Sequence, residues 1–239
     1  MKNMIKNILF AMVLLAFASC SRDAVFYSNR AYSYNSKGDW DRAIADSTKA
    51  INLDKNLAAA YNNRGNAYLN KGDWDHAIDD FSQAIQLEPN AIGYFNRSLA
   101  YAAKGDYDKV IADCTQALSF DQKLVDTYNN RSNAYINKGE WDLAIDDCTQ
   151  AIRLDYDSVA AYNNRGVAYN NKGDYDRAIN TLNQAIQLGS NWENPYRHRA
   201  FAHMKKGNLS QARADVNRAL QINPNYQSAQ ALLEELNNL

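Results

Sequence analysis

The chain has 239 residues, enough for one sizeable domain or an elongated array, and its formal net charge at pH 7 is −1. This balance argues against a nucleic-acid-binding protein, which would carry a basic field, and against a long acidic disordered tail. Only three prolines, 16 tyrosines and regularly spaced glycines favour a helical repeat over a loop-rich fold.

The first twenty residues form a segment of their own. Lys2 and Lys6 precede the ten-residue apolar run ILFAMVLLAF (8–17). This run is short for a membrane span and typical of a secretory signal. The run leads into FASC (17–20), which resembles the lipobox of bacterial lipoproteins. An ordinary cleaved signal with an incidental cysteine is the alternative.

The lipobox resemblance implies a signal peptide over residues 1–19 and a lipidated Cys20, followed by a short tether that ends at residue 23. Ser21 after the cysteine favours sorting to the outer membrane over the inner one. We therefore expect a lipid-anchored protein of the bacterial cell envelope.

The rest of the chain is periodic. An aromatic or apolar residue follows a Gly-Asp-like turn at intervals of 34, 33, 34, 34 and 34 residues. These residues are Trp40, Trp74, Tyr107, Trp141, Tyr175 and Leu209. The preceding glycines keep the same register, at Gly38, Gly72, Gly105, Gly139, Gly173 and Gly207. We therefore expect six copies of one structural repeat.

The second copy shows what each repeat contains. Residues 58–71 are expected to form a helix that Gly72 ends in a left-handed conformation. Asp73 caps a second helix over residues 74–87, whose apolar residues recur at three-and-four spacing, and Pro89 closes it. Each repeat is therefore predicted to be a helical hairpin.

The second copy resembles a tetratricopeptide repeat, with Gly65 and Tyr68 in the first helix and Ala77, Ala84 and Pro89 in and after the second. The resemblance implies an all-α, right-handed superhelical solenoid whose first helices line a concave groove. Its six repeats are expected at 24–57, 58–90, 91–124, 125–158, 159–192 and 193–226. Residues 227–239 are expected to form the capping helix of such an array.

An arginine recurs at the seventh position of each repeat, and a carboxylate follows it by sixteen residues in five of the six. In the family this position faces the second helix, so we predict partly buried ion pairs that fix register. The predicted pairs are Arg30 with Asp46, Arg64 with Asp80, Arg97 with Asp113, Arg131 with Asp147, and Arg199 with Asp215. Arg165 has Thr181 at the matching position, which predicts either a weak fifth repeat or an arginine that is satisfied by backbone carbonyls.

The sequence offers no catalytic constellation. The glycines are helix terminators, and His198 and His203 lie five residues apart, which does not place them on one helical face as metal ligands. Cys114 and Cys148 occupy the same register of adjacent repeats, too far apart for a disulfide, and are interpreted as small core residues. We expect no enzyme, no metal and no cofactor.

Family geometry implies a partner-binding groove that is rich in asparagine, a poor helix former whose amide offers donors and an acceptor. The predicted groove residues are Asn62, Asn66, Asn70, Phe95, Leu99, Asn129, Asn133, Asn137, Asn163 and Asn170. The leading prediction is a non-catalytic scaffold or assembly adaptor that binds a protein or peptide there, is anchored in the membrane by its lipid, and does not bind nucleic acid. Capture of a carbohydrate by the amides and aromatic rings is the alternative, and so is retention of asparagine from one duplicated parental repeat.

Overall fold

The structure, a computed structural model, describes residues 21–239. Every regular element in this range is a helix, so the all-α prediction is confirmed. The signal peptide and Cys20 lie outside the described residues. The chain divides into two compact bodies, one ending at Lys109 and one running from Val110 to Leu239.

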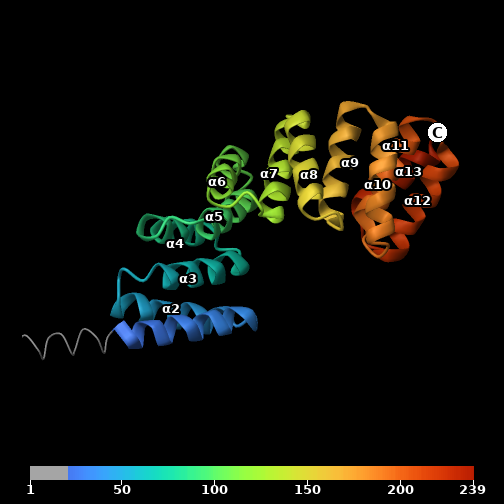
Figure 1. The fold of residues 1–239 in the computed structure, drawn as a ribbon. Coiled ribbons are helices and arrows are strands. Elements are labelled where there is room, and N and C mark those ends of the chain that lie inside the picture. The colour runs from blue at the N-terminus through green and yellow to red at the C-terminus, as the bar shows by residue number, and fades with distance from the viewer. Residues whose placement is uncertain (1–20) are drawn as a thin grey trace, which may run out of the picture. The chain divides into compact units, whose positions relative to one another are not determined.

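In the first body, residues 21–36 are helical and are followed by four helices of 14 residues each. These are α2 (Trp40–Leu53), α3 (Ala58–Lys71), α4 (Trp74–Leu87) and α5 (Ala91–Lys104). The observed bounds of α3 and α4 match the predicted helices. Helix α3 packs against both α2 and α4, and α4 also packs against α5 (Figure 1).

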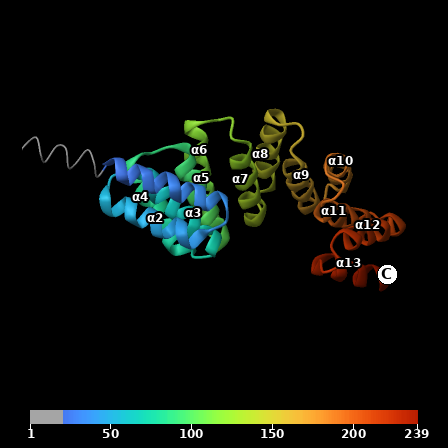
Figure 2. The same cartoon turned by 90° about the horizontal axis from the view of Figure 1, so that it is seen from below.

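The boundary between the bodies falls within helix α6 (Tyr107–Phe120). The second body continues with the hairpins of the last three repeats and one further helix, which lie side by side in chain order (Figures 1 and 2). Its helices are α7 (Val125–Lys138), α8 (Trp141–Leu154), α9 (Val159–Lys172), α10 (Tyr175–Leu188), α11 (Glu193–Lys205), α12 (Leu209–Ile222) and α13 (Gln227–Asn237).

Each repeat has a first helix, here called the A helix, and a second, the B helix. In the second body, the A helices α7, α9 and α11 contact one another in sequence. Among its described residues, the B helices α8, α10 and α12 make no such contact with one another. The A helices therefore lie on the inner side of this stack, where a partner-binding groove is expected.

The turn of each hairpin follows the predicted chemistry. Gly72 ends α3 with φ +79°, a left-handed conformation that a residue with a Cβ rarely adopts. The Asp73 side chain accepts a hydrogen bond from the backbone N–H of His76 at 3.4 Å, which caps the start of α4.

Packing inside each hairpin depends on matched sizes at the eighth and twenty-fourth repeat positions. Gly65 faces the buried ring of Phe81, and a Cβ added at Gly65 would lie 2.8 Å from Phe81 Cε1. Gly166 and Leu182 pack in the same way. Where the B helix carries a smaller residue, the A helix carries a larger one, as in the buried pair Ala200 and Val216. The size of the side chain at one of these positions thus limits the size of the side chain at the other.

The two described cysteines belong to this packing layer. Cys114 and Cys148 are free and buried, and each occupies the twenty-fourth position of its repeat. The Cys148 thiol lies beside Ser132, and burial raises the pKa of Cys148 to about 12. Cys148 is therefore a protonated core residue at neutral pH, because an apolar site disfavours the thiolate.

Candidate binding surface on the A helices

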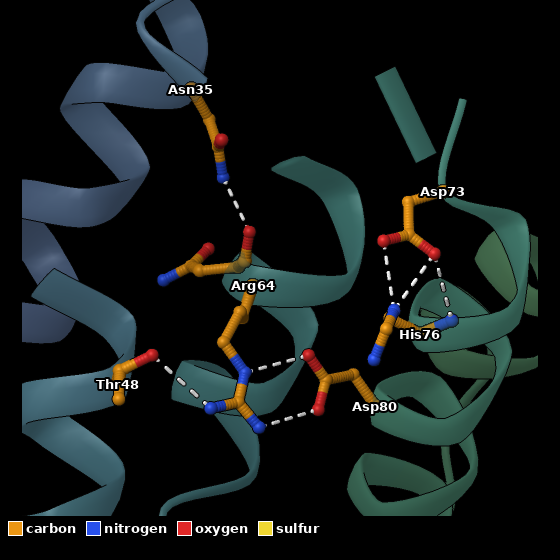
Figure 3. Close-up of polar contacts among 7 residues, drawn as sticks. Asn35, Thr48, Arg64, Asp73, His76 and Asp80 are labelled. Atoms are coloured by element: carbon orange, nitrogen blue, oxygen red, sulfur yellow. Dashed lines mark hydrogen bonds and ion pairs between the residues drawn. The ribbon is translucent and has the colours of Figure 1, made fainter. Parts of the chain in front are cut away.

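The recurrent arginine belongs to the frame of the hairpin. Arg64 Nε and Nη2 each donate a hydrogen bond to the Asp80 carboxylate at 2.8 Å (Figure 3). The two residues therefore form a bidentate ion pair between α3 and α4. Asp80 is only 6% exposed, and its hydrogen bonds raise the pKa of Arg64. A paired, buried carboxylate of this kind fixes the register of two helices.

The same pair occurs in three other repeats. The distances between nitrogen and oxygen lie between 2.5 and 2.9 Å in Arg30 with Asp46, Arg131 with Asp147, and Arg199 with Asp215. The predicted pair of Arg97 and Asp113 joins residues of different bodies and stays a prediction.

A second contact of these arginines is absent from the sequence-based prediction. Arg64 Nη1 donates to Thr48 Oγ1 at 3.2 Å, across to the B helix of the preceding repeat (Figure 3). Equivalent bonds run from Arg97 to Ser82, from Arg131 to Thr115 and from Arg199 to Asn183. Each of these arginines therefore links a hairpin to its neighbour. The signal in the sequence is a polar residue at position 25 of the preceding repeat.

Arg165 is the exception that the sequence indicates. Its Nε atom is buried and has no hydrogen-bond partner among the described residues, although the guanidinium lies 5.4 Å from the centre of the Tyr162 ring. Thr149, at position 25 of the preceding repeat, donates to the Ile145 carbonyl of its own helix at 2.7 Å, but within residues 21–239 it accepts no hydrogen bond from Arg165. An unpaired buried donor lowers stability, which agrees with a weak fifth repeat.

Lysines that end the A helices add an exposed row of ion pairs between neighbouring repeats. Lys71 Nζ lies 2.5 Å from Asp41 Oδ1, and the same pairing joins Lys104 to Asp75, Lys172 to Asp142 and Lys206 to Asp176. Because these pairs are exposed, water screens them and each contributes little to the stability of the fold.

Several asparagines hold neighbouring A helices together. Asn35 Nδ2 donates to the Asn63 carbonyl at 2.7 Å (Figure 3). Asn63 Nδ2 donates in turn to the Ser28 carbonyl at 2.9 Å. In the second body, Asn170 Nδ2 donates to the His198 carbonyl at 2.8 Å. These amides are therefore structural contacts between repeats.

This placement changes the predicted set of groove residues. Asn163 is 6% exposed and Asn170 is 5% exposed, so neither presents a free amide to a large partner, and we remove both from the proposed contact surface. Asn62 and Asn129 are half-buried, and their Oδ1 atoms are buried without a hydrogen-bond partner in the described part of the chain.

The open amides lie one and two turns further along the helices. Asn70, Asn133 and Asn137 are exposed, and Asn66 is half-buried. Asn70 Nδ2 donates to the Asn66 carbonyl, and Asn137 Nδ2 donates to the Asn133 carbonyl, each at 2.8 Å. These bonds orient the two amides. Asn70 Oδ1 and Asn137 Oδ1 accept no hydrogen bond within residues 21–239 and can accept one from a partner, whereas Asn133 Oδ1 accepts one from Asn137 Nδ2 at 3.0 Å.

The predicted apolar positions Phe95 and Leu99 lie on α5 in the first body, and both are half-buried. Tyr32, on the first described helix, is 68% exposed. Within residues 21–239, no group of three or more His, Cys, Asp or Glu side chains is placed to hold a metal ion. In the same range, no helix has the length and apolar character needed to cross a membrane.

Comparison with known proteins identifies the repeat. Tetratricopeptide repeat patterns match residues 58–90, 91–124, 129–194 and 194–226, and a further TPR repeat pattern matches residues 31–72. No curated protein sequence matches the chain.

Solved structures show the same fold. The Cut9–Hcn1 hetero-tetramer of the APC/C is similar with a TM-score of 0.77 and 21% identity over 95% of this chain, which spans 45% of the matched chain. A tetratricopeptide repeat protein from Parabacteroides merdae has a TM-score of 0.77 and 18% identity, covering 90% of this chain and 86% of its own. YrrB, described as a TPR protein with an unusual peptide-binding site, has a TM-score of 0.64 and 23% identity, covering 77% and 92%.

The repeat matches together cover residues 31–124 and 129–226, and the matches at 58–90 and 194–226 each coincide, to within one residue at the start, with one helical hairpin. The chain therefore belongs to the tetratricopeptide repeat family.

Proposed function

We propose that this protein is a cell-envelope lipoprotein whose A helices bind an extended segment of another protein, so that it acts as a non-catalytic scaffold or assembly adaptor. Tetratricopeptide repeats are a scaffold typical of protein–protein interaction. The observation that carries the proposal is a pair of half-buried or exposed amides on an A helix of each body, taken by itself: Asn66 and Asn70 on α3, and Asn133 and Asn137 on α7. Such amides can pair with the N–H and C=O groups of an extended backbone.

A test of the binding surface uses crosslinked capture from isolated envelopes, with the captured proteins identified by mass spectrometry. Replacing Asn66, Asn70, Asn133 and Asn137 together by alanine should remove the specific partner. Alanine is a better helix former than asparagine, so loss of the partner would not reflect unfolding of the helices.

The matched control makes the same change at Asn52 and Asn180, which are exposed on the B helices α2 and α10. This variant should capture the partner as the unmodified protein does. An unchanged set of captured proteins in the A-helix variant would disprove the assignment of the surface.

The proposed anchoring rests on the signal-like run at residues 8–17 and on Cys20, and it needs its own test. In a bacterial host grown with an alkyne-labelled fatty acid, the protein should be labelled and should fractionate with the outer membrane. Cys20→Ala should lose both properties, whereas Cys148→Ala, which changes a buried core thiol, should keep both. An unlabelled wild-type protein would exclude a lipid anchor.

Carbohydrate binding remains a second candidate because Tyr32 presents an aromatic ring that is 68% exposed. Aromatic faces and amides together can bind sugar rings and hydroxyl groups. Glycan-array binding that is lost on Tyr32→Ala or Phe95→Ala would favour this function. An array without signal would eliminate it.

A further inference from the structure

The first described helix, residues 21–36, is the A helix of the first repeat, and Phe26 at its third repeat position is 57% exposed. In every later repeat this position carries a buried residue that is smaller than phenylalanine, namely Ala60, Gly93, Thr127, Ala161 and Pro195. Ala60 packs with Ala50 and Ile51 of the preceding B helix. Within the described residues no repeat precedes the first one, so Phe26 lies on a side of the helix that is left uncovered.

Arg30 on the same helix lacks a contact that the later frame arginines make. Its Nε and Nη2 atoms bind Asp46, but its Nη1 atom donates to no atom of residues 21–239. Arg64 Nη1, by contrast, donates to Thr48 in the preceding repeat. The Arg30 side chain is accordingly 40% exposed, against 21% for Arg64. Arg30 therefore presents an open donor where a preceding repeat would supply an oxygen.

Lys37, directly after the helix, also lacks the partner that its position has elsewhere. The lysine at this repeat position contacts an aspartate of the preceding repeat in four later repeats, as Lys71 does with Asp41. Lys37 is exposed and forms no ion pair with any residue of the described chain. A preceding repeat would supply a carboxylate at this point.

The groups named above belong to one face. Phe26, Arg30 and Lys37 are spaced by four and seven residues, which places them on the same side of a helix. The Arg30 guanidinium lies 5.3 Å from the centre of the Phe26 ring. Asn29 is also exposed, whereas the matching Asn63 donates to Ser28 of the preceding repeat. We call Phe26, Asn29, Arg30 and Lys37 the uncovered face.

The chemistry of the uncovered face matches that of an anionic bilayer surface. An aromatic ring needs an apolar environment, while the guanidinium and the ammonium group need anionic oxygens close by. Lipid phosphates above acyl chains supply both within a few ångströms. A symmetric contact between two copies of this face would instead bring the cations of both copies together, which is unfavourable.

The place of the uncovered face in the chain also favours a bilayer. The helix begins at residue 21, directly after Cys20, and Phe26 lies only about 8 Å further along its axis. A lipid on Cys20 would keep this turn of the helix at the membrane. Tethering of this kind makes even a weak second contact effective, because the face cannot diffuse away.

We propose that the uncovered face docks on an anionic bilayer, with the Phe26 ring at the level of the upper acyl chains and Arg30 Nη1 and Lys37 Nζ on lipid phosphates. The proposal rests on the proposed function, because the anchor at Cys20 brings the face to the membrane. Docking fixes the orientation of the first repeat on that membrane, which a flexible anchor alone does not do.

The test uses the lipidated full-length protein, reconstituted on preformed vesicles of phosphatidylethanolamine and phosphatidylglycerol. Asn29→Cys places an NBD fluorophore on the uncovered face, and Gln86→Cys places it on an exposed site of α4 as the control. The native Cys114 and Cys148 are buried and do not compete for the label. Dithionite added outside the vesicles reduces the fluorophore, and the rate of reduction reports how accessible each site is.

We expect the label at residue 29 to be reduced about tenfold more slowly than the label at residue 86, because burial of a Phe side chain shifts a docking equilibrium by at least this factor. Phe26→Ala should remove most of this protection. Alanine occupies the same position in the second and fifth repeats, so the helix accommodates it. Ile92→Ala, which removes a 65% exposed apolar side chain from α5, should keep the protection.

A second variant tests the charge. Lys37→Gln should weaken the protection on vesicles that contain phosphatidylglycerol and leave it unchanged on vesicles of phosphatidylcholine alone, because a lysine is attracted only to the anionic surface. Equal protection of the wild type and Lys37→Gln on both kinds of vesicle would contradict the contact with anionic lipid.

The remaining outcomes separate this proposal from the proposed function. Lipidated protein that floats with the vesicles but loses both labels at the same rate would overturn the docking and leave the anchor standing. Protection that appears without vesicles and grows with protein concentration would assign the face to a second copy of the chain and overturn the docking as well. Protein that carries no lipid and does not bind the vesicles would overturn both the docking and the anchor.

Discussion

At the scale of single residues, the two states of the recurrent arginine have opposite consequences for stability. Arg64 holds a buried carboxylate, whereas Arg165 carries a buried Nε without a partner. Removing one member of a buried pair leaves the other charge buried without a partner. Removing a donor that has no partner leaves no other group unpaired.

We therefore expect Arg64→Leu to lower the free energy of unfolding by about 3 kcal/mol. Arg165→Leu, in the matching YNNRG sequence of the fifth repeat, should stay within about 1 kcal/mol of the unmodified protein or stabilise it. Urea unfolding followed by circular dichroism measures both. Equal losses would show that the ion pair does not set the stability of the second repeat.

Two histidines whose pKa values are shifted in opposite directions predict that stability depends on pH. The folded-state pKa of His198 is about 3, against an ordinary value of 6.5, so between these values the unfolded chain binds more protons than the folded one. The contribution of His198 to stability is therefore complete above pH 6.5 and is lost as the pH falls towards 3. His76 has a raised pKa because Asp73 accepts its hydrogen bond, so its contribution is lost as the pH rises.

When the pH is lowered from 7 to 5, we expect the urea concentration at the unfolding midpoint of the second body to decrease. His198→Asn should make this decrease smaller. Asparagine can still accept the hydrogen bond that Arg197 Nη1 donates to His198 Nδ1 at 3.1 Å, so the contact is kept while the titration is removed. His76→Asn is the control, and it should not make the decrease smaller. Identical pH profiles for the wild type and His198→Asn would contradict the burial of this imidazole.

At the scale of the helical element, the hairpins are specified by pairs of residues of matched size. A Cβ added at Gly166 would lie 2.5 Å from Leu182 Cγ, inside any real contact distance. The sixth repeat has Ala200 and Val216 at the same two positions, both fully buried. An alanine in the A helix is therefore compatible with a smaller residue in the B helix.

Gly166→Ala should destabilise the protein by about 1 to 3 kcal/mol, even though alanine favours the helix. Adding Leu182→Val, which reproduces the pair of the sixth repeat, should recover most of the loss. A double-mutant cycle measured by urea unfolding gives the coupling between the two sites. Additive effects would show that the two residues do not limit each other.

The sequence predicted the elements well because their causes are local. Gly72 and Asp73 define the turn through their own backbone and side-chain chemistry, and α3 and α4 have the expected bounds. The pairing of Arg64 with Asp80 follows from helix register within one hairpin. The bond from Arg64 to Thr48 was missed because it depends on the stagger between two hairpins.

At the scale of the whole molecule, the stability of a repeat array is a sum of repeat terms and neighbour terms. The bond from Arg64 to Thr48 belongs to the neighbour term between the first two repeats. Thr149 occupies the same repeat position as Thr48, but within the described residues its hydroxyl accepts no hydrogen bond from the arginine of the following repeat. Comparing substitutions at these two threonines therefore distinguishes an effect on the coupling between repeats from an effect on the stability of a single repeat.

We expect Thr48→Val to weaken the coupling by about 1 kcal/mol and to speed hydrogen exchange in residues 21–36 and α2, with less effect on α4. Thr149→Val should leave the exchange pattern between repeats unchanged. Mass spectrometry of peptic fragments resolves these segments. A uniform increase across α2 to α5 after Thr48→Val would contradict a local role for this bond.

The sequence by itself determined the repeat, its hairpins, its caps and the arginine–aspartate register, because each depends on residues within one hairpin. Only the tertiary structure decided which polar groups join neighbouring hairpins and which remain open. Asn70 and Asn170 are both predicted groove residues, yet Asn70 is exposed and Asn170 is buried against the next A helix. The position of a neighbouring hairpin decides this difference, and so it decides which amides a partner can reach.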